Sequence, residues 1–143
     1  MNDISILPTI PSREQINQLE VANKQHPQIE VPVVHYFANG VYAREITIKA
    51  GTLLTGKVHK TEHLNIVSKG EITVWTETGM KRVKAPFTMV SKPGTKRVGF
   101  AHEDTVWTTI HGTHETDLVK LEADLIESVS IESDDKELLA WHG

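Results

Sequence analysis

The sequence predicts an all-β barrel or sandwich with a short helix at each end. About eight short runs of β-branched and aromatic residues lie between residues 29 and 112, and turn signals separate them at regular spacing. Between two of these runs stands Asn39-Gly40, the strongest short signal for a β-hairpin, because its turn needs positive φ at both residues. After Gly112 the apolar residues change to helical spacing.

Length and composition restrict the class of protein. A chain of 143 residues favours one domain with its own core, and a net charge of −4 argues against a nucleic acid polymer as partner. The chain has no cysteine, which excludes disulfides, thiolate zinc sites and cysteine nucleophiles. No apolar run approaches the length of a membrane span, and the N-terminus does not resemble a signal peptide. We therefore expect a cytoplasmic protein without a membrane partner.

Residues 1–28 are expected to form an arm followed by a helix. Ser12 and Gln15 match a capping box, in which each side chain bonds to the backbone N–H of the other residue. Ile16 and Leu19 follow at helical spacing. This helix is predicted to pack on the outside of the sheet.

Residues 29–112 are assigned to the barrel. Its predicted strands are 31–37, 41–48, an extended segment within 50–70, 72–75, 81–84, 87–90, 96–100 and 105–111. In the second strand, Tyr42, Arg44 and Ile46 share one face. Trp75 and Trp107 are interpreted as core residues. The fifth predicted strand is basic and is interpreted as a solvated edge strand. Its basic residues are Lys81, Arg82 and Lys84.

Residues 113–143 are expected to hold a C-terminal helix and an acidic tail. A helix over residues 116–128 is predicted from apolar spacing and early acidic residues, with Leu118, Leu121, Leu125 and Ile126 on its apolar face. Trp141, close to the C-terminus, is interpreted as a docking anchor.

The segment 50–70 carries the candidate site. If it is one extended strand, Lys57, His59, Thr61 and His63 line one face, and Glu62 points to the other. Two histidines four residues apart can share a metal ion, provided that the fold supplies a third ligand. The candidates for that ligand are His35, His102, His111 and His114.

The order of turns and histidines over residues 40–112 resembles a small single-domain cupin. In the first cupin motif, Gly51 opens the pattern, His59 occupies the second histidine position, and Gly70 closes it. The second motif is similar to Lys92-Pro93-Gly94 and the residues after it. The resemblance implies an RmlC-like jelly roll, that is, a double-stranded β-helix, with a metal held by three histidines and a carboxylate.

Two of the four implied ligand positions hold cations in this chain. Lys57 and Arg97 replace histidines, and His63 replaces the carboxylate. A charged Lys or Arg has no lone pair for a metal, so the metal site is degenerate. A pocket lined by Lys57, His59, His63 and Arg97 favours a small anionic molecule, for which a nucleotide-like ligand is one candidate.

Three functions stay open at this point. The first is binding of a small anion in the barrel. The second is a metal enzyme, a dioxygenase or isomerase, with one divalent metal on His59 and His63. The third is a structural protein with a vestigial pocket. The resemblance also implies a homodimer or larger homo-oligomer. Cupins are common in bacteria and tailed phages, and a phage-encoded protein of this kind would sequester a host signalling molecule.

Overall fold

The computed structural model describes residues 10–24 and 31–127. In that part of the chain it has two helices and nine strands. The elements are α1 (Arg13–Lys24), β1 (Val33–Ala38), β2 (Val41–Ile48), β3 (Leu53–Thr55), β4 (His63–Lys69), β5 (Glu71–Thr76), β6 (Gly79–Lys84), β7 (Phe87–Ser91), β8 (Val98–Ala101), β9 (Thr105–Gly112) and α2 (Leu118–Leu125).

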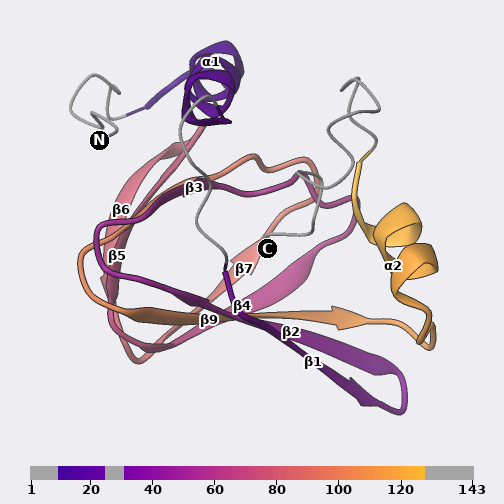
Figure 1. Cartoon of the computed structure of the whole chain (residues 1–143). Coiled ribbons are helices and arrows are strands. Elements are labelled where there is room, and N and C mark those ends of the chain that lie inside the picture. Colours follow the sequence, from indigo (N-terminus) through magenta and orange to yellow (C-terminus); the bar gives the residue numbers. More distant parts are fainter. Residues whose placement is uncertain (1–9, 25–30, 128–143) are drawn as a thin grey trace.

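The strands form two antiparallel sheets that curve into a barrel (Figure 1). One sheet has five strands in the order β1-β2-β9-β4-β7, and the other has four in the order β3-β8-β5-β6. The β1–β2 hairpin turns at Asn39-Gly40, where Gly40 has a φ of 78°, as the sequence predicts. The strands of the described residues lie within residues 29–112, and the predicted all-β class is confirmed.

The inner face of the five-stranded sheet follows from strand alternation. Tyr42, Arg44 and Ile46, which share a predicted face, are all buried. Trp107 is buried on the neighbouring strand, and Trp75 is buried on the four-stranded sheet, as predicted for core residues. The main apolar cluster joins both sheets and consists of Ile46, Ile48, Val67, Ile72, Val74, Val83, Ala101 and Trp107. The basic strand is β6, which forms an exposed edge as expected.

The segment 50–70 is not one extended strand, so this prediction is wrong. β3 belongs to the four-stranded sheet and β4 to the five-stranded sheet. The chain must therefore cross between the sheets over residues 56–62, and a segment that leaves one sheet for another cannot keep the hydrogen bonds of a strand. Within the crossing, His59 makes one isolated bridge, to Ile126.

Helix α1 begins as the capping box predicts. Ser12 N donates to Gln15 Oε1 at 2.8 Å, and Gln15 N donates to Ser12 Oγ at 3.1 Å. Ile16 and Leu19 are buried in a second apolar cluster with residues of β3, β5 and β8. Lys96, only 3% exposed, donates to both carboxylate oxygens of Glu20 at 3.0 and 2.9 Å. Helix α1 is thus fixed to the barrel by apolar and ionic contacts.

Helix α2 is shorter than the range predicted for it. Asp117 caps it, because its side chain accepts from the backbone N–H groups of the first turn. Leu121 and Leu125 pack with Ile126 and Tyr42 against the end of the barrel, whereas Leu118 is 43% exposed and not part of this contact. Trp141 lies outside the described residues. No helix of the described part is long and apolar enough to cross a membrane.

The contact between Glu20 and Lys96 yields a stability prediction. Substitution Glu20→Ala leaves a buried ammonium group without its carboxylate, and we expect the free energy of unfolding to fall by about 3 kcal/mol. Urea denaturation of the metal-free protein measures this loss. Gln18→Ala, on the exposed side of the same helix, is the control and should change stability by less than about 0.5 kcal/mol. Equal losses in the two variants would contradict the assignment.

Candidate metal centre

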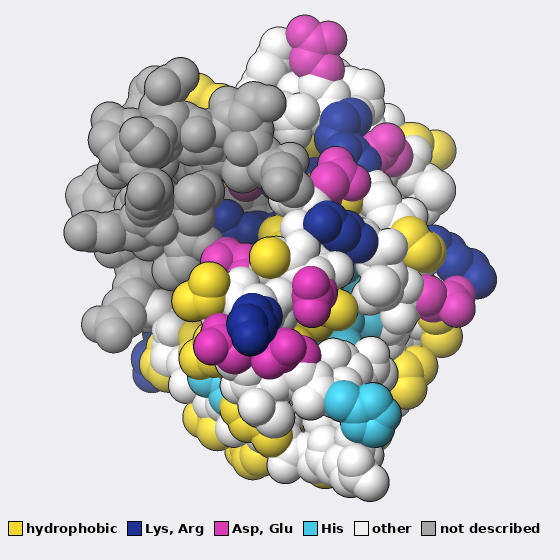
Figure 2. All heavy atoms as spheres, turned by 90° about the vertical axis from the view of Figure 1, so that its right-hand side faces the viewer, with side chains coloured by type: hydrophobic (Ala, Val, Ile, Leu, Met, Phe, Trp, Pro, Cys, Tyr) yellow, Lys and Arg dark blue, Asp and Glu magenta, His cyan; other side chains and the backbone are white. Residues whose placement is uncertain are grey.

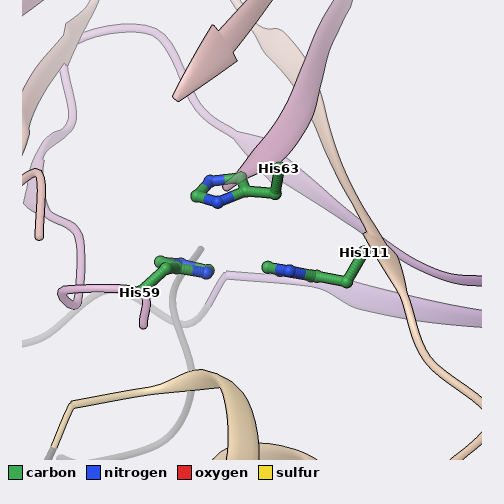
Figure 3. A group of neighbouring side chains, drawn as sticks. All are labelled: His59, His63 and His111. Carbon is green, nitrogen blue, oxygen red and sulfur yellow. The ribbon is translucent and has the colours of Figure 1, made fainter. Parts of the chain in front are cut away.

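Three histidines from three parts of the chain meet at one end of the barrel. His63 begins β4, His111 lies near the end of β9, and His59 lies in the crossing between the sheets. Their rings point toward one another (Figure 3). The register of β4 and β9 explains part of this arrangement. Leu64 pairs with Ile110 in the antiparallel ladder, so the residues next to them, His63 and His111, lie side by side on the inner face.

The spacing of the rings suits a single metal ion. The potential ligand nitrogens of the three histidines all lie within 4.8 Å of one another. Tetrahedral zinc with bonds of about 2.05 Å requires about 3.3 Å between ligand nitrogens, so modest side-chain rotation closes the site. The side chains are almost fully buried, with exposures of 2% for His59, 5% for His63 and 1% for His111. Across the described ranges, no carboxylate joins this group.

Hydrogen bonding gives His63 the tautomer of a metal ligand. Its Nδ1 lies 3.0 Å from the carbonyl oxygen of Thr61, which can only accept, so Nδ1 carries the proton. The lone pair is therefore on Nε2, which is buried and has no hydrogen-bond partner among the described residues. In metal-bound histidines, the ring nitrogen that does not bind the metal usually donates a hydrogen bond of this kind to a carbonyl or carboxylate oxygen. The residues present thus fit a metal ion.

Burial and nearby charges favour the neutral rings of His63 and His111, the form that binds a metal. The pKa of His111 is lowered to about 3, mainly by burial and in addition by the positive charges of His63, Arg44 and Arg97. Burial also lowers the pKa of His63; the carbonyl of Thr61 opposes this shift and the charge of Arg97 adds to it.

The C-terminal end of α2 and the residues after it hold His59 in place. Lys60 N donates to Leu125 O at 2.7 Å, and Glu127 N donates to Val58 O at 2.8 Å, so the backbone on both sides of His59 is paired with the end of the helix. In addition, Gly94 N donates to the carbonyl oxygen of His59 at 3.0 Å. The position of His59 thus depends on contacts outside the strands.

A polar network extends from the histidines into the barrel. Ser91 pairs with His63 across β4 and β7, and it accepts hydrogen bonds from Arg97 Nη1 and from Asn65 Nδ2. Asn65 Oδ1 accepts from Trp107 Nε1 at 3.1 Å, and the guanidinium carbon of Arg97 lies 5.2 Å from the Trp107 ring centroid. Burial lowers the pKa of Arg97 to about 10, so Arg97 is a cation at neutral pH.

Two of the predicted site residues, His59 and His63, are thus brought together with a third histidine. Of the four candidates for a third ligand, only His111 lies with them in the described part of the chain. His35 Nδ1 instead lies 2.7 Å from the hydroxyl oxygen of Tyr42, and His102 forms a hydrogen bond with Thr73 of β5. The remaining candidate, His114, is exposed.

The other predicted contacts are placed differently from the histidines. Glu62 is exposed and pairs with Lys92 at 2.6 Å, as expected for a surface residue. Lys57 is half-buried in the crossing between the sheets, so it does not share a strand face with His63. The roles of Lys57 and Arg97 as ligand contacts stay predictions.

The barrel has a groove at the histidines and a cavity lined by Arg97. The outer groove, of about 290 Å³, reaches His63 and His111, and its remaining lining is Val41, Glu62, Leu64, Val90, Ile110 and Gly112. The inner cavity, of about 30 Å³, includes Arg97 and Trp107 in its lining. On the face that carries α2, the acidic and basic side chains of the described residues are intermixed (Figure 2).

Comparison with known proteins identifies the fold. No protein-family model and no curated protein sequence matches this chain. Among solved structures, it is similar to a cupin superfamily protein from Desulfitobacterium hafniense DCB-2, with 10% identity, coverage of 74% of this chain and 96% of that chain, and a TM-score of 0.52. It is also similar to KdgF from Halomonas sp., with 16% identity, coverage of 68% and 94%, and a TM-score of 0.51.

A third similar structure is described in the same terms as the sequence prediction. It is an RmlC-like cupin family protein with a double-stranded β-helix fold from Methanocaldococcus jannaschii, with 15% identity, coverage of 59% of this chain and 82% of that chain, and a TM-score of 0.51. This chain therefore has the cupin fold. Identities this low establish the fold alone, so the function must be argued from the site.

The low pKa of His111 predicts that acid destabilises the metal-free protein. Its pKa is 6.5 when unfolded and about 3 when folded, so the unfolded chain binds the extra proton between these values. The contribution of neutral His111 to the free energy of unfolding is fully present above pH 6.5 and is lost as the pH falls toward 3. Between pH 7 and pH 5, His111 alone should lower the free energy of unfolding by about 2 kcal/mol. Urea denaturation with a chelator present measures the loss.

The matched variants for this measurement are His111→Gln and His114→Gln. We expect His111→Gln to lose about 2 kcal/mol less between pH 7 and pH 5 than the parent protein. His114 is exposed, and its substitution should leave the pH dependence unchanged. Identical pH profiles for the parent and His111→Gln would refute the prediction.

Proposed function

We propose that this protein is a metal-binding cupin that holds one divalent transition-metal ion on His59, His63 and His111, with a small anionic molecule beside it. The observation that carries the proposal is the convergence of three buried imidazoles whose ligand atoms lie within 4.8 Å. Three imidazoles suit zinc, copper, iron or nickel. A bound ion would supply a Lewis acid with open coordination positions.

The charge around the histidines supports an anion as the second component. Arg44 and Arg97 both lower the pKa of His111, so two guanidinium groups act on the site. A divalent ion would add to this positive charge, and an anion that binds next to it would offset the repulsion. Arg97 forms none of the ion pairs found in the described residues, which leaves its charge available to a ligand.

The size and charge of the cavities favour an anion smaller than a nucleotide. The inner cavity, which Arg97 lines, has only about 30 Å³. The outer groove is larger, but its only charged lining residue is the acidic Glu62, which repels phosphate. We therefore propose a small anion in place of the nucleotide-like ligand considered from the sequence.

A metal-dependent enzyme is the second candidate. A site with three histidines leaves coordination positions open, which is typical of catalytic metal sites and not of closed structural sites. Against this candidate, no carboxylate of the described residues joins the histidines as a general base. The geometry therefore favours binding, and an isomerase or dioxygenase stays the alternative.

Metal titration tests the proposal. The purified protein, stripped with a chelator, should bind one equivalent of Zn²⁺ in calorimetry. His63→Ala and His111→Ala should each weaken the dissociation constant by at least about 100-fold, because each removes one of three ligands. His102→Ala, which removes a histidine bonded to Thr73, is the control and should bind like the parent.

Two results would exclude a metal site. One is uptake of less than about a tenth of an equivalent of zinc, iron, nickel or copper after dialysis against each metal. The other is equal loss of Zn²⁺ affinity in His102→Ala and His111→Ala. Either result would favour the protein with a vestigial pocket.

A further inference from the structure

The inner cavity combines an apolar lining with one cation. Its volume is about 30 Å³. Apart from Arg97, every lining residue is apolar or glycine, and the full set is Ile46, Ile48, Leu54, Gly56, Ile72, Val74, Arg97, Gly99 and Trp107. A space of this kind excludes a second charged group, because burying an unpaired charge among aliphatic side chains is costly.

Arg97 connects this cavity with the histidines. One end of its guanidinium donates to Ser91, the residue that pairs with His63 across the sheet. The same group lies over the ring of Trp107, which lines the cavity. An anion bound to Arg97 is therefore placed at the boundary between the metal position and the apolar space.

A buried hydroxyl lies between the two regions. Thr109 stands between Trp107 and His111 on the inner face of β9, since alternate residues of a strand point to the same side. Its side chain is 1% exposed, and Oγ1 has no hydrogen-bond partner among the described residues. A buried hydroxyl without a partner is unfavourable and is typical of a place where a ligand or water supplies the bond.

We propose that the ligand of this site is a short aliphatic monocarboxylate. Its carboxylate lies between Arg97 and the metal position, accepts from the hydroxyl of Thr109, and extends a hydrocarbon tail of one to three carbons into the inner cavity. This inference rests on the proposed function, because the carboxylate is the small anion assigned there. An apolar cavity of about 150 Å³ holds benzene, so a cavity of about 30 Å³ suits only a few carbon atoms.

The test compares the sodium salts of formate, acetate, propionate, butyrate and hexanoate by calorimetry. Binding to the zinc-loaded protein should tighten by about fourfold for each methylene up to propionate or butyrate, as expected for apolar burial. It should then weaken for hexanoate, which exceeds the cavity. Malonate and phosphate, which bring a second charge, should bind more weakly than propionate.

Variants locate the two ends of the ligand. Arg97→Met removes the charge but keeps an unbranched side chain, and it should weaken propionate binding at least about tenfold. Arg82→Met is the control, because Arg82 lies on the exposed edge strand with Glu71 as its partner. Ile46→Val enlarges the cavity and should move the preferred chain length upward, whereas Val74→Ile should move it downward.

The outcomes separate this inference from the proposed function. If zinc binds with one equivalent but no carboxylate binds, or if affinity does not depend on chain length, the monocarboxylate is excluded and the metal assignment stands. If zinc does not bind, the same salts are titrated into the metal-free protein. A chain-length preference that moves in Ile46→Val then supports the carboxylate site without the metal, and no binding overturns both.

Discussion

The site depends on positive charge buried inside the barrel. Arg44 is 1% exposed on β2, and Arg97 is partly buried, with its guanidinium over the ring of Trp107. Burial lowers the pKa of each guanidinium to about 10, which still leaves both charged at neutral pH. These charges favour the neutral forms of His63 and His111, and they would make an anion a favourable companion for the proposed metal ion. Tyr42 and, to a smaller extent, Glu122 of α2 oppose the effect of burial on the pKa of Arg44.

The fold brings these groups together through the central strand of the five-stranded sheet. β9 pairs with β2 on one side and with β4 on the other. Its inner face presents Trp107, Thr109 and His111 in order along the barrel. The strand therefore carries one residue for each of three environments, namely the apolar cavity, the buried polar layer and the histidine cluster. A shift of its register by one residue would turn all three outward.

Much of the fold could be predicted because it depends on local signals. The hairpin at Asn39-Gly40, the cap at Ser12 and the common face of Tyr42 and Arg44 need only neighbouring residues, and the structure confirms them. The crossing at residues 56–62 could not be predicted in the same way, because which sheet a strand joins depends on distant pairing.

The third histidine was only partly accessible from the sequence. His111 could not be chosen over His35, His102 and His114 by spacing alone, because the choice depends on how strands pair. One signal was available, since Trp107 was expected in the core and His111 stands four residues later on the same strand face. His59 needed tertiary contacts as well, because α2 positions it and no strand does.

The pairing of the His59 segment with the end of α2 also determines when the site can exist during synthesis. Val58 and Lys60 bond to Glu127 and Leu125, so nearly seventy residues must follow His59 out of the ribosome before its backbone is fixed. The strands that carry His63 and His111 are complete earlier, at Gly112. The nascent barrel would therefore present only two of the three histidines, and a site for the proposed metal ion would be complete only after α2 docks.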